Sequence, residues 1–376
     1  MIERRKRTRR TGGTYSVWRV RWRDAGGRGR NRTFDRKADA EAFEAQVKLR
    51  KRAGQLQTID SGKETLADFA QEWWSAYAEP NLERATLKSY ETIWNNHALP
   101  RLGDVQLREL TPRLLSDFRT ELEREGVGAA AVRRTLVMVQ GMLQRAVEWE
   151  RIPSNPARVV RKPNGKRIRA IRPLSPAEVE LIRTWLLNRK RSRDATLVSV
   201  LAYSGVRPQE ALALEWSNVR ERTLLVEAAV AFGTIKAQKN RRPPRTAELF
   251  GALKQDLAEW RLAQGRPGPG ELIFPESGGG LWSEHDWRNW RRRCFAKAAE
   301  AVGIEGSRPY DLRHSFASLL IHEGRSVVEV AAQLGHSPTM TLTTYAHVMA
   351  ELSDGPRRKA EDEIRAARKS ARRSAA

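Results

Sequence analysis

Residues 15–23 alternate between hydrophobic and polar side chains, with tryptophans and valine on one face and arginines on the other. A period of two is typical of a β-strand that covers a core with one face. Residues 28–34 could form the returning strand, and apolar residues recur at helical spacing in 37–52. The pattern predicts a small antiparallel sheet packed on one helix within residues 1–60, with an arginine-rich outer face.

After a polar stretch the pattern changes to the 3.6-residue period of amphipathic helices. Thr65 and Asp68 have the spacing of a capping box, which marks a helix start. Pro112 is expected at the first position of one helix. Pro100, which follows Leu99, is expected to end another. A compact four-helix domain is predicted for residues 65–160, with helices that start at Thr65 and span 86–99, 111–125 and 129–150.

Residues 151–173 carry prolines and basic side chains without hydrophobic periodicity, which predicts an exposed cationic linker. Ser175 and Pro176 then begin a mostly helical domain, 174–350, in which short strands are expected between Leu224 and Phe250. The basic tail is 351–376, and from Arg357 on it is expected to be helical or disordered. After Gly355 it is either a solvated helix or a segment that docks on a neighbouring protomer. The predicted fold class is multidomain and mainly α.

Charge narrows the choice of partner. The chain has 69 Lys and Arg against 45 Asp and Glu, a net charge of +24. Residues 1–60 alone hold 18 basic and 7 acidic residues, a net +11. A polyanion is the expected partner, and nucleic acid is favoured over a membrane surface because no basic helix has a strong apolar face. The candidate DNA contacts are Arg19, Arg21, Arg23, Arg161, Lys162, Lys166 and Arg167.

Other compositional features exclude some classes of protein. No apolar run approaches the ~20 residues of a membrane span, and no apolar segment follows the basic start, so we expect no secretory signal. Cys294 is the one cysteine, which excludes an internal disulfide and a cysteine-rich zinc module. We therefore expect a cytoplasmic protein.

Three short stretches carry residues suited to phosphate chemistry. The first places Arg207 between Gly205 and Pro208, at a turn into a helix, with Glu210 three residues on. The second is Tyr310-Asp-Leu-Arg-His314. The third is Leu334-Gly-His336, with a tyrosine nine residues beyond the histidine, at Tyr345.

Read together, these stretches resemble the conserved boxes of the tyrosine recombinase (phage integrase) family. The order and spacing of the three boxes match inside a basic chain. The helical segment 65–160 is similar to the family's core-binding domain, and the N-terminal sheet and helix look like the arm-binding domains of some integrases. The resemblance implies a site-specific recombinase that cuts and rejoins DNA through a 3′-phosphotyrosine intermediate, without ATP, metal or other cofactor.

The resemblance also implies a role for each residue. Arg207 and Arg313 would clamp the non-bridging phosphate oxygens, because guanidinium forks match them. His336 would donate a further hydrogen bond, and Tyr345 would attack phosphorus. Glu210 and His314 are supporting residues, Glu210 as a partner that fixes the Arg207 fork.

Two positions depart from the family pattern. The general acid of the family is a lysine on a β-hairpin; Lys236 is in register with it, and Lys239 is the alternative. Tyr310 occupies a position that is usually histidine, and a phenol is a poor proton shuttle near neutral pH. We expect Tyr310 to orient the phosphate or the nucleophile, while Lys236 and His336 take over the acid–base work.

The leading hypothesis is an integrase that acts as a tetramer on two duplexes at attachment sites, with accessory DNA-bending or directionality proteins as further partners. One alternative is a catalytically weakened DNA-binding protein on the same scaffold, for which Tyr310 is the support. Another is a relaxing enzyme of the topoisomerase type. The sequence names neither the attachment sites nor the direction of the reaction, because phosphate contacts carry no base specificity.

Overall fold

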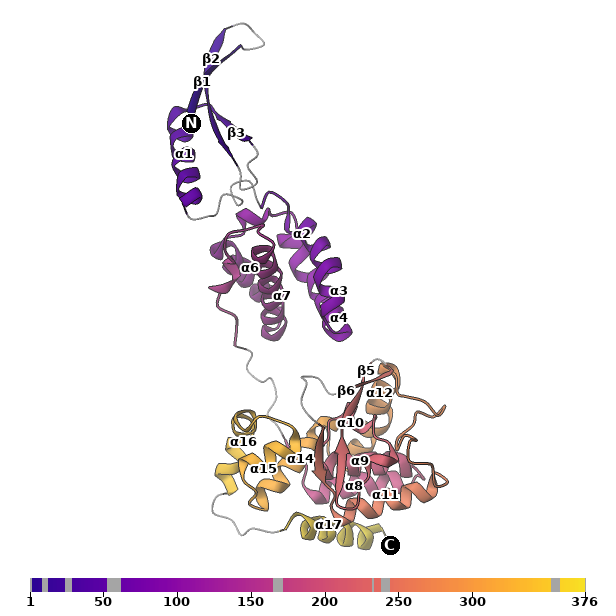
Figure 1. Ribbon diagram of the computed structural model, residues 1–376. Helices are drawn as coiled ribbons and strands as arrows, with labels where there is room; N and C mark the ends of the chain where they lie inside the picture. Colours follow the sequence, from indigo (N-terminus) through magenta and orange to yellow (C-terminus); the bar gives the residue numbers. More distant parts are fainter. Residues whose placement is uncertain are drawn as a thin grey trace. The chain divides into compact units, whose positions relative to one another are not determined.

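The structure is a computed structural model that describes residues 2–8, 13–23, 29–52, 62–164, 172–231, 233–237, 244–352 and 359–375 (Figure 1). It separates into two compact units, residues 1–168 and 169–376. Helices dominate both units, and the described strands form one three-stranded and two two-stranded sheets. The predicted mainly-α, multidomain fold class is confirmed. None of the described helices has the length and apolar character needed to span a bilayer.

The N-terminal sheet has the order β1-β2-β3, from Ile2–Thr8, Thr14–Arg23 and Gly29–Phe34, and is antiparallel throughout. Helix α1, Lys37–Arg52, covers one face (Figure 1). Val20 is buried against Phe43 and Val47 of α1, which confirms the face predicted from alternation. The first strand was not predicted, because β1 is largely arginine and lysine and is held by its pairing with β2 rather than by apolar alternation.

The helical domain of the first unit is built from the elements expected, with additional short turns. Thr65 caps the first helix in a capping box with Asp68, and Thr111 caps the helix that starts at Pro112. The elements are α2 (Leu66–Trp73), η2 (Trp74–Ala78), α3 (Glu79–Asn81), α4 (Arg84–Ile93), η3 (Trp94–Ala98), α5 (Leu99–Leu102), η4 (Leu107–Glu109), α6 (Pro112–Arg124), α7 (Ala129–Glu148) and η5 (Pro156–Arg158).

The prediction that a helix ends at Pro100 is wrong. A π-helical turn, η3, precedes the proline, and helical structure continues through α5 to Leu102. Proline removes one backbone donor from a helix. Arg101 compensates from its side chain, where Nη1 donates to the carbonyl oxygens of His97 at 3.1 Å and Asn96 at 3.5 Å.

The expectation that residues 151–173 form an exposed linker is wrong for its first part. Ile152, Ala157 and Val160 are buried in the core of the helical domain. Asn155 anchors this stretch, since its side chain donates to the carbonyl of Gln140 at 2.9 Å. Hydrophobic periodicity misses such a segment because its apolar residues follow no regular spacing.

The second unit contains α8 and α9 (Pro176–Leu187, Ser192–Tyr203), which pack on each other, and α9 also packs on α14 (Pro309–His322). The predicted capping box at Ser175 is confirmed. Short strands occur where they were expected, as β4 (Thr223–Val226) paired with β7 (Arg245–Glu248), and β5 (Ala228–Ala231) paired with β6 (Thr234–Ala237). The remaining elements are α10 (Pro208–Ala211), η6 (Trp216–Asn218), α11 (Gly251–Ala263), α12 (Glu284–Trp290), η7 (Arg291–Phe295), α13 (Ala296–Ala301), α15 (Val327–Leu334), α16 (Pro338–Leu352) and α17 (Ala360–Ala375).

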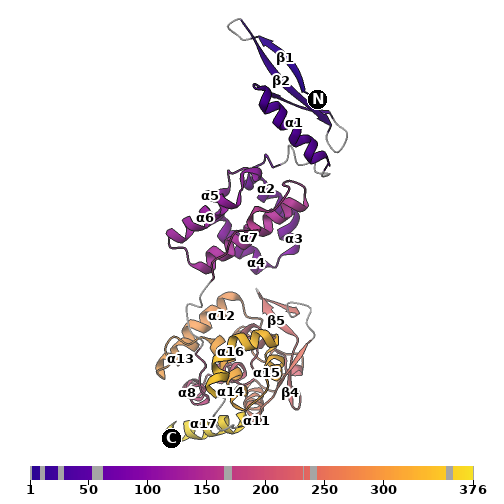
Figure 2. The same cartoon turned by 90° about the vertical axis from the view of Figure 1, so that its left-hand side faces the viewer.

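The C-terminal helix α17 lies along α8 and α11 of its own chain (Figures 1 and 2). Its Ala360 and Ile364 are fully buried. The Arg368 guanidinium donates to Glu180 Oε1 at 3.3 Å and to Asp256 Oδ2 at 2.5 Å. Docking on the same chain therefore replaces both alternatives considered for this part of the tail, a solvated helix and a segment docked on a neighbour.

We expect Arg368→Ala to weaken this docking strongly. Arg183 would remain as a cation beside Glu180 and Asp256, but removing one partner from a buried ionic cluster still costs about 3 kcal/mol. Urea unfolding should show that loss, and amide exchange should accelerate in residues 360–375. Arg372→Ala, at an exposed position of the same helix, should change the unfolding free energy by less than about 0.5 kcal/mol. Equal effects of both substitutions would contradict a specific contact at Arg368.

Candidate active site

The turn between α9 and α10 presents Arg207. Gly205 has a left-handed φ of +62°, and an added Cβ there would overlap the Phe316 ring and lie 2.9 Å from Leu334 Cδ2. Only glycine suits such a position. Pro208 then begins α10, with Arg207 as its N-cap residue. This turn fixes the backbone from which the Arg207 side chain extends.

Glu210 holds two arginines at once. Its Oε1 accepts from Arg207 Nη1 at 2.6 Å, and its Oε2 accepts from Arg245 Nη2 at 2.7 Å. Burial alone would raise the pKa of Glu210, but the hydrogen bonds and charges of Arg245 and Arg207 lower it below its ordinary value. The carboxylate therefore remains charged and fixes both guanidinium groups, as predicted for Arg207.

Arg245, on β7, was missed by sequence reasoning. Its Nε donates to the Gln333 carbonyl at 3.2 Å, and its side chain packs under Gly335, where an added Cβ would lie 2.9 Å from Arg245 Cδ. The residue lies between the lysine region and the second box, outside the motifs themselves. No sequence signal pointed to it, because its contact with Glu210 joins segments 35 residues apart.

Arg313 lies at the centre of the site and is 0% exposed. Its guanidinium donates to the carbonyl oxygens of Gly205 and Leu334, and Nη2 lies 2.8 Å from His336 Nε2. Burial and the neighbouring Arg207 lower the pKa of Arg313 to about 10, so it stays charged at neutral pH. Among the described residues, its buried Nε has no hydrogen-bond partner.

His336 follows the left-handed Gly335 (φ +63°) that ends α15. Because arginine only donates, Nε2 must accept from Arg313, and the ring proton lies on Nδ1. That Nδ1 is buried and lacks a hydrogen-bond partner within the described part of the chain. Burial and the charges of Arg313, Arg207 and Arg245 lower the pKa of His336 to about 3. The side chain is thus a neutral donor with one N–H uncommitted to the described protein groups.

Tyr345 lies on α16 and is 0% exposed. Its Oη is 2.7 Å from Nδ1 of His314. Tyr310, one turn before His314 on α14, is 43% exposed and meets the His314 ring edge-on at 5.3 Å between centroids. His314, predicted only as a supporting residue, is therefore in hydrogen-bond contact with the candidate nucleophile.

The lysine candidates are only partly within the described residues. The backbone of Lys236 lies in β6 and pairs with Ala229, whereas Lys239 lies outside the described residues. Whether Lys236 or Lys239 is the general acid stays a prediction.

The candidate DNA contacts are spread over both domains of the first unit. Arg21 and Arg23 are exposed on β2, and Arg19 on the same strand is half-buried. Arg161 is exposed, and Lys162 donates to the side chain of Gln140. Lys166 and Arg167 lie outside the described residues.

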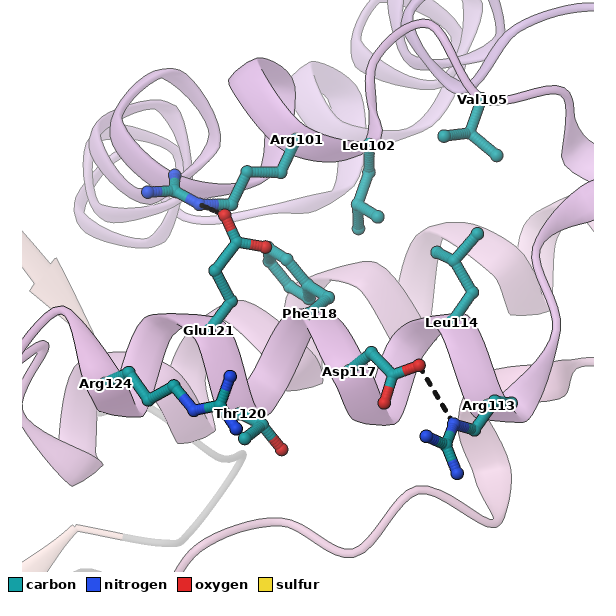
Figure 3. Close-up of a pocket in the computed structure, with 10 residues that line it drawn as sticks. All are labelled: Arg101, Leu102, Val105, Arg113, Leu114, Asp117, Phe118, Thr120, Glu121 and Arg124. Atoms are coloured by element: carbon teal, nitrogen blue, oxygen red, sulfur yellow. Dashed lines mark hydrogen bonds and ion pairs between the residues drawn. The ribbon is translucent and has the colours of Figure 1, made fainter.

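A separate pocket lies between α5 and α6 of the helical domain (Figure 3). Its charges largely neutralise one another, because Arg101 pairs with Glu121 at 3.1 Å and Arg113 pairs with Asp117 at 2.9 Å. Four more side chains that approach it, including Leu102 and Phe118, are apolar (Figure 3). It contains neither the nucleophile nor the arginine pair, so it is not the candidate active site.

Comparison with known families agrees with this geometry. The phage integrase family profile matches residues 172–351, and the profile of the phage integrase N-terminal SAM-like domain matches residues 65–122. The chain belongs to the phage integrase family. The first profile includes Arg207, Arg313, His336 and Tyr345.

Individual relatives of this phage integrase family member include a putative prophage phiRv2 integrase of Mycobacterium tuberculosis, 26% identical over 84% of each chain. A tyrosine recombinase XerD of Pseudomonas aeruginosa is 34% identical over 43% of this chain and 52% of its own length. Among solved structures, a Tn1549 transposon integrase with circular intermediate DNA has a TM-score of 0.64 at 17% identity, over 77% of this chain and 98% of that one. A lambda integrase dimer bound to a core site has a TM-score of 0.59 at 17% identity, over 94% and 96%.

We expect His336 to remain neutral well below the pH at which histidine normally titrates. Carbon-13 labelling of the six histidines, with His336→Asn to assign the signal, should show no titration of His336 above about pH 5. A midpoint near the ordinary 6.5 would contradict the placement of its ring among the arginines.

The same shift makes a stability prediction with a definite sign. Between pH 6.5 and about 3 the unfolded chain binds a proton at His336 that the folded chain does not. The contribution of this group to folding is therefore complete above pH 6.5 and is lost as the pH falls. His336→Asn should flatten the acid side of the stability curve, and His322→Asn, at a half-buried position elsewhere on α14, should leave its slope unchanged.

Proposed function

We propose that this chain is a site-specific DNA recombinase, an integrase, that cleaves and rejoins DNA through a 3′-phosphotyrosine intermediate. The observation that carries the proposal is the junction where Arg207, Arg313 and the neutral His336 meet around the carbonyls of Gly205, Leu334 and Gly335. The phenol that would attack, Tyr345, is held on the neighbouring helix α16.

The junction suits a phosphodiester in its charge and in its donors. Three arginines and one glutamate leave a net charge of +2 beside the uncharged His336. Attack at phosphorus concentrates negative charge on the non-bridging oxygens, and preorganised donors stabilise that charge. Arg207 is partly exposed, Arg313 offers Nε, and His336 offers Nδ1–H. Arg245 acts through Glu210 as a positioning residue.

In the first step the Oη of Tyr345 bonds to phosphorus and the bond to the 5′-oxygen breaks. The leaving oxygen takes a proton from a general acid, for which Lys236 on β6 remains our first choice. The covalent intermediate keeps the energy of the broken bond, so the reverse attack by another 5′-hydroxyl needs no nucleotide cofactor. Because Tyr345 is buried, DNA binding must uncover its hydroxyl before attack.

Double-stranded DNA is the proposed partner, with self-association into a tetramer on two duplexes. Structural neighbours support this, since they include a lambda integrase tetramer bound to a Holliday junction. The names of relatives, a prophage integrase and phage integrases, support a mobile element as the substrate. Arg21 and Arg23 on β2, together with Arg161 and Lys162 at the end of the helical domain, would add contacts to DNA phosphates. The strength of these contacts should fall as the salt concentration rises. Accessory proteins remain a prediction.

A suicide substrate tests the proposal directly. Such a duplex carries a nick near the scissile phosphate, so that the short 5′-hydroxyl fragment diffuses away and the adduct accumulates. The full chain should form a covalent adduct at specific positions of a genomic library, and Tyr345→Phe should remove it completely because the nucleophile is lost. Tyr90→Phe, a matched change in the helical domain, should retain it. An adduct that persists in Tyr345→Phe would overturn the proposal, and adducts without sequence preference would favour a relaxing enzyme.

Tyr310 makes a second prediction for the same assay. Its exposed phenol lies against His314, where it can orient the phosphate and the nucleophile. Tyr310→Phe should slow adduct formation by about tenfold or more, in line with the loss of one hydrogen bond to a charged group. Tyr310→His should cleave at least as fast as the unmodified chain. Unchanged cleavage by Tyr310→Phe would show that the hydroxyl has no part in the reaction.

A further inference from the structure

Three aromatic rings form a row that ends at the nucleophile. Tyr310 and His314 lie one turn apart on α14, with centroids 5.3 Å apart, and His314 meets Tyr345 of α16 at 5.6 Å. Nδ1 of His314 lies 2.7 Å from Tyr345 Oη. We infer that His314 is the catalytic residue that accepts the proton of Tyr345 during attack. This inference rests on the proposed function and adds the missing base to it.

The other two candidates are less suited to that task. His336 already uses Nε2 to accept from Arg313, carries its proton on Nδ1, and is surrounded by cations. Tyr310 is a phenol itself, so a transfer to it from Tyr345 gains nothing, because both groups have the same intrinsic basicity. An imidazole accepts protons near neutral pH. The expectation that the acid–base work shifts to Lys236 and His336 stays a prediction for the general acid, and we add His314 as the base.

The proton balance closes with this assignment. The His314 ring starts neutral, with its proton on Nε2 and its Nδ1 lone pair toward the phenol. As the bond from Tyr345 Oη to phosphorus forms, the phenolic proton moves to Nδ1 and gives an imidazolium. The departing 5′-oxygen receives its proton from the general acid. When an incoming 5′-hydroxyl attacks the phosphotyrosine, Tyr345 leaves and takes the proton back from His314.

The surroundings of His314 allow the cation to form and also limit its lifetime. Within the described part of the chain, Tyr310 of the same helix and Tyr345 of α16 meet its ring. His336 interacts with it electrostatically, and the Arg313 and Arg207 guanidinium groups act on His336 in turn. The nearby positive charges oppose a lasting imidazolium, and the negative phosphate of bound DNA offsets them. Proton acceptance should therefore be strongest when the phosphate is in place.

The decisive experiment follows adduct formation in single-turnover mode with the full chain, from about pH 5 to about pH 9. The substrate carries sulfur in place of the bridging 5′-oxygen, because a thiolate leaves without a proton and removes the general acid from the profile. His314→Gln can still hydrogen-bond Tyr345 but cannot accept its proton. The matched control is His322→Gln on the same helix.

We expect the unmodified chain and His322→Gln to show a rate that rises through the titration of an imidazole and then levels. His314→Gln should react about 10²- to 10⁴-fold more slowly at pH 7. The rate of this variant should not rise through the titration of an imidazole. It should rise instead as the pH approaches the pKa of tyrosine, ~10. The assignment would be overturned if His314→Gln reacted as fast as the unmodified chain or faster. It would also be overturned if the variant did not react at any pH, or if its rate were lower by the same factor at every pH and still rose through the titration of an imidazole.

A second variant guards against a folding defect. His314→Ala leaves room for a small base, and added imidazoles should restore adduct formation in proportion to their basicity. A folded variant that gains nothing from any added imidazole would again contradict proton transfer. The two proposals fail differently: if the unmodified chain forms no adduct at Tyr345, the proposed function is wrong, whereas a normal adduct with an unaltered His314→Gln profile rejects only the role of His314.

Discussion

The buried guanidinium of Arg313 is the interaction on which the candidate site depends. It contacts the turn at Gly205, the end of α15 at Leu334, and His336. Gly205 lies more than 100 residues before the other two in the sequence. Leaving a buried charge without such partners would cost several kcal/mol. The carbonyls must therefore stay where they are, and Gly205, which leaves no space for a Cβ beside Phe316, keeps its carbonyl in place. The residues that fold the second unit and those of the proposed phosphate clamp are therefore held by the same contacts.

Sequence patterns predicted elements whose ends carry local signals. Thr65, Thr111 and Ser175 each cap a helix through their own side chains, so no distant contact was needed to place those starts. The errors occur where distant contacts decide. At Pro100 a π turn and the Arg101 side chain allow the helix to continue, and residues after Glu150 join the core without any periodic spacing. Strand β1 is likewise defined by its partner strand and not by its own composition.

In the candidate site, too, local motifs were predicted and contacts between distant segments were not. Motif spacing led to Arg207, Arg313, His336 and Tyr345, and it paired Arg207 with Glu210. It could not reveal that Glu210 also holds Arg245, because that contact joins α10 to a strand 35 residues away. Nor could it separate the tasks of the two histidines. Their roles follow from which ring nitrogen faces which neighbour, and that is set by the packing of α14 against α15 and α16.

Tyr345, the proposed nucleophile, is fully buried, so it would have to be both protected and reactive. The contact between His314 and Tyr345 satisfies both demands, since the hydrogen bond that holds the phenol inside the unit is also the path by which its proton can leave. Exposing Oη would require loss of this hydrogen bond, worth about 1 kcal/mol, and also of the core packing of Tyr345 and α16. In the proposed reaction the binding energy of DNA has to supply both. If the imidazole follows the phenol as Oη is exposed, the proton acceptor arrives with the nucleophile. Deprotonation is then coupled to DNA binding, because the phosphate that Tyr345 attacks is also the charge that favours the imidazolium.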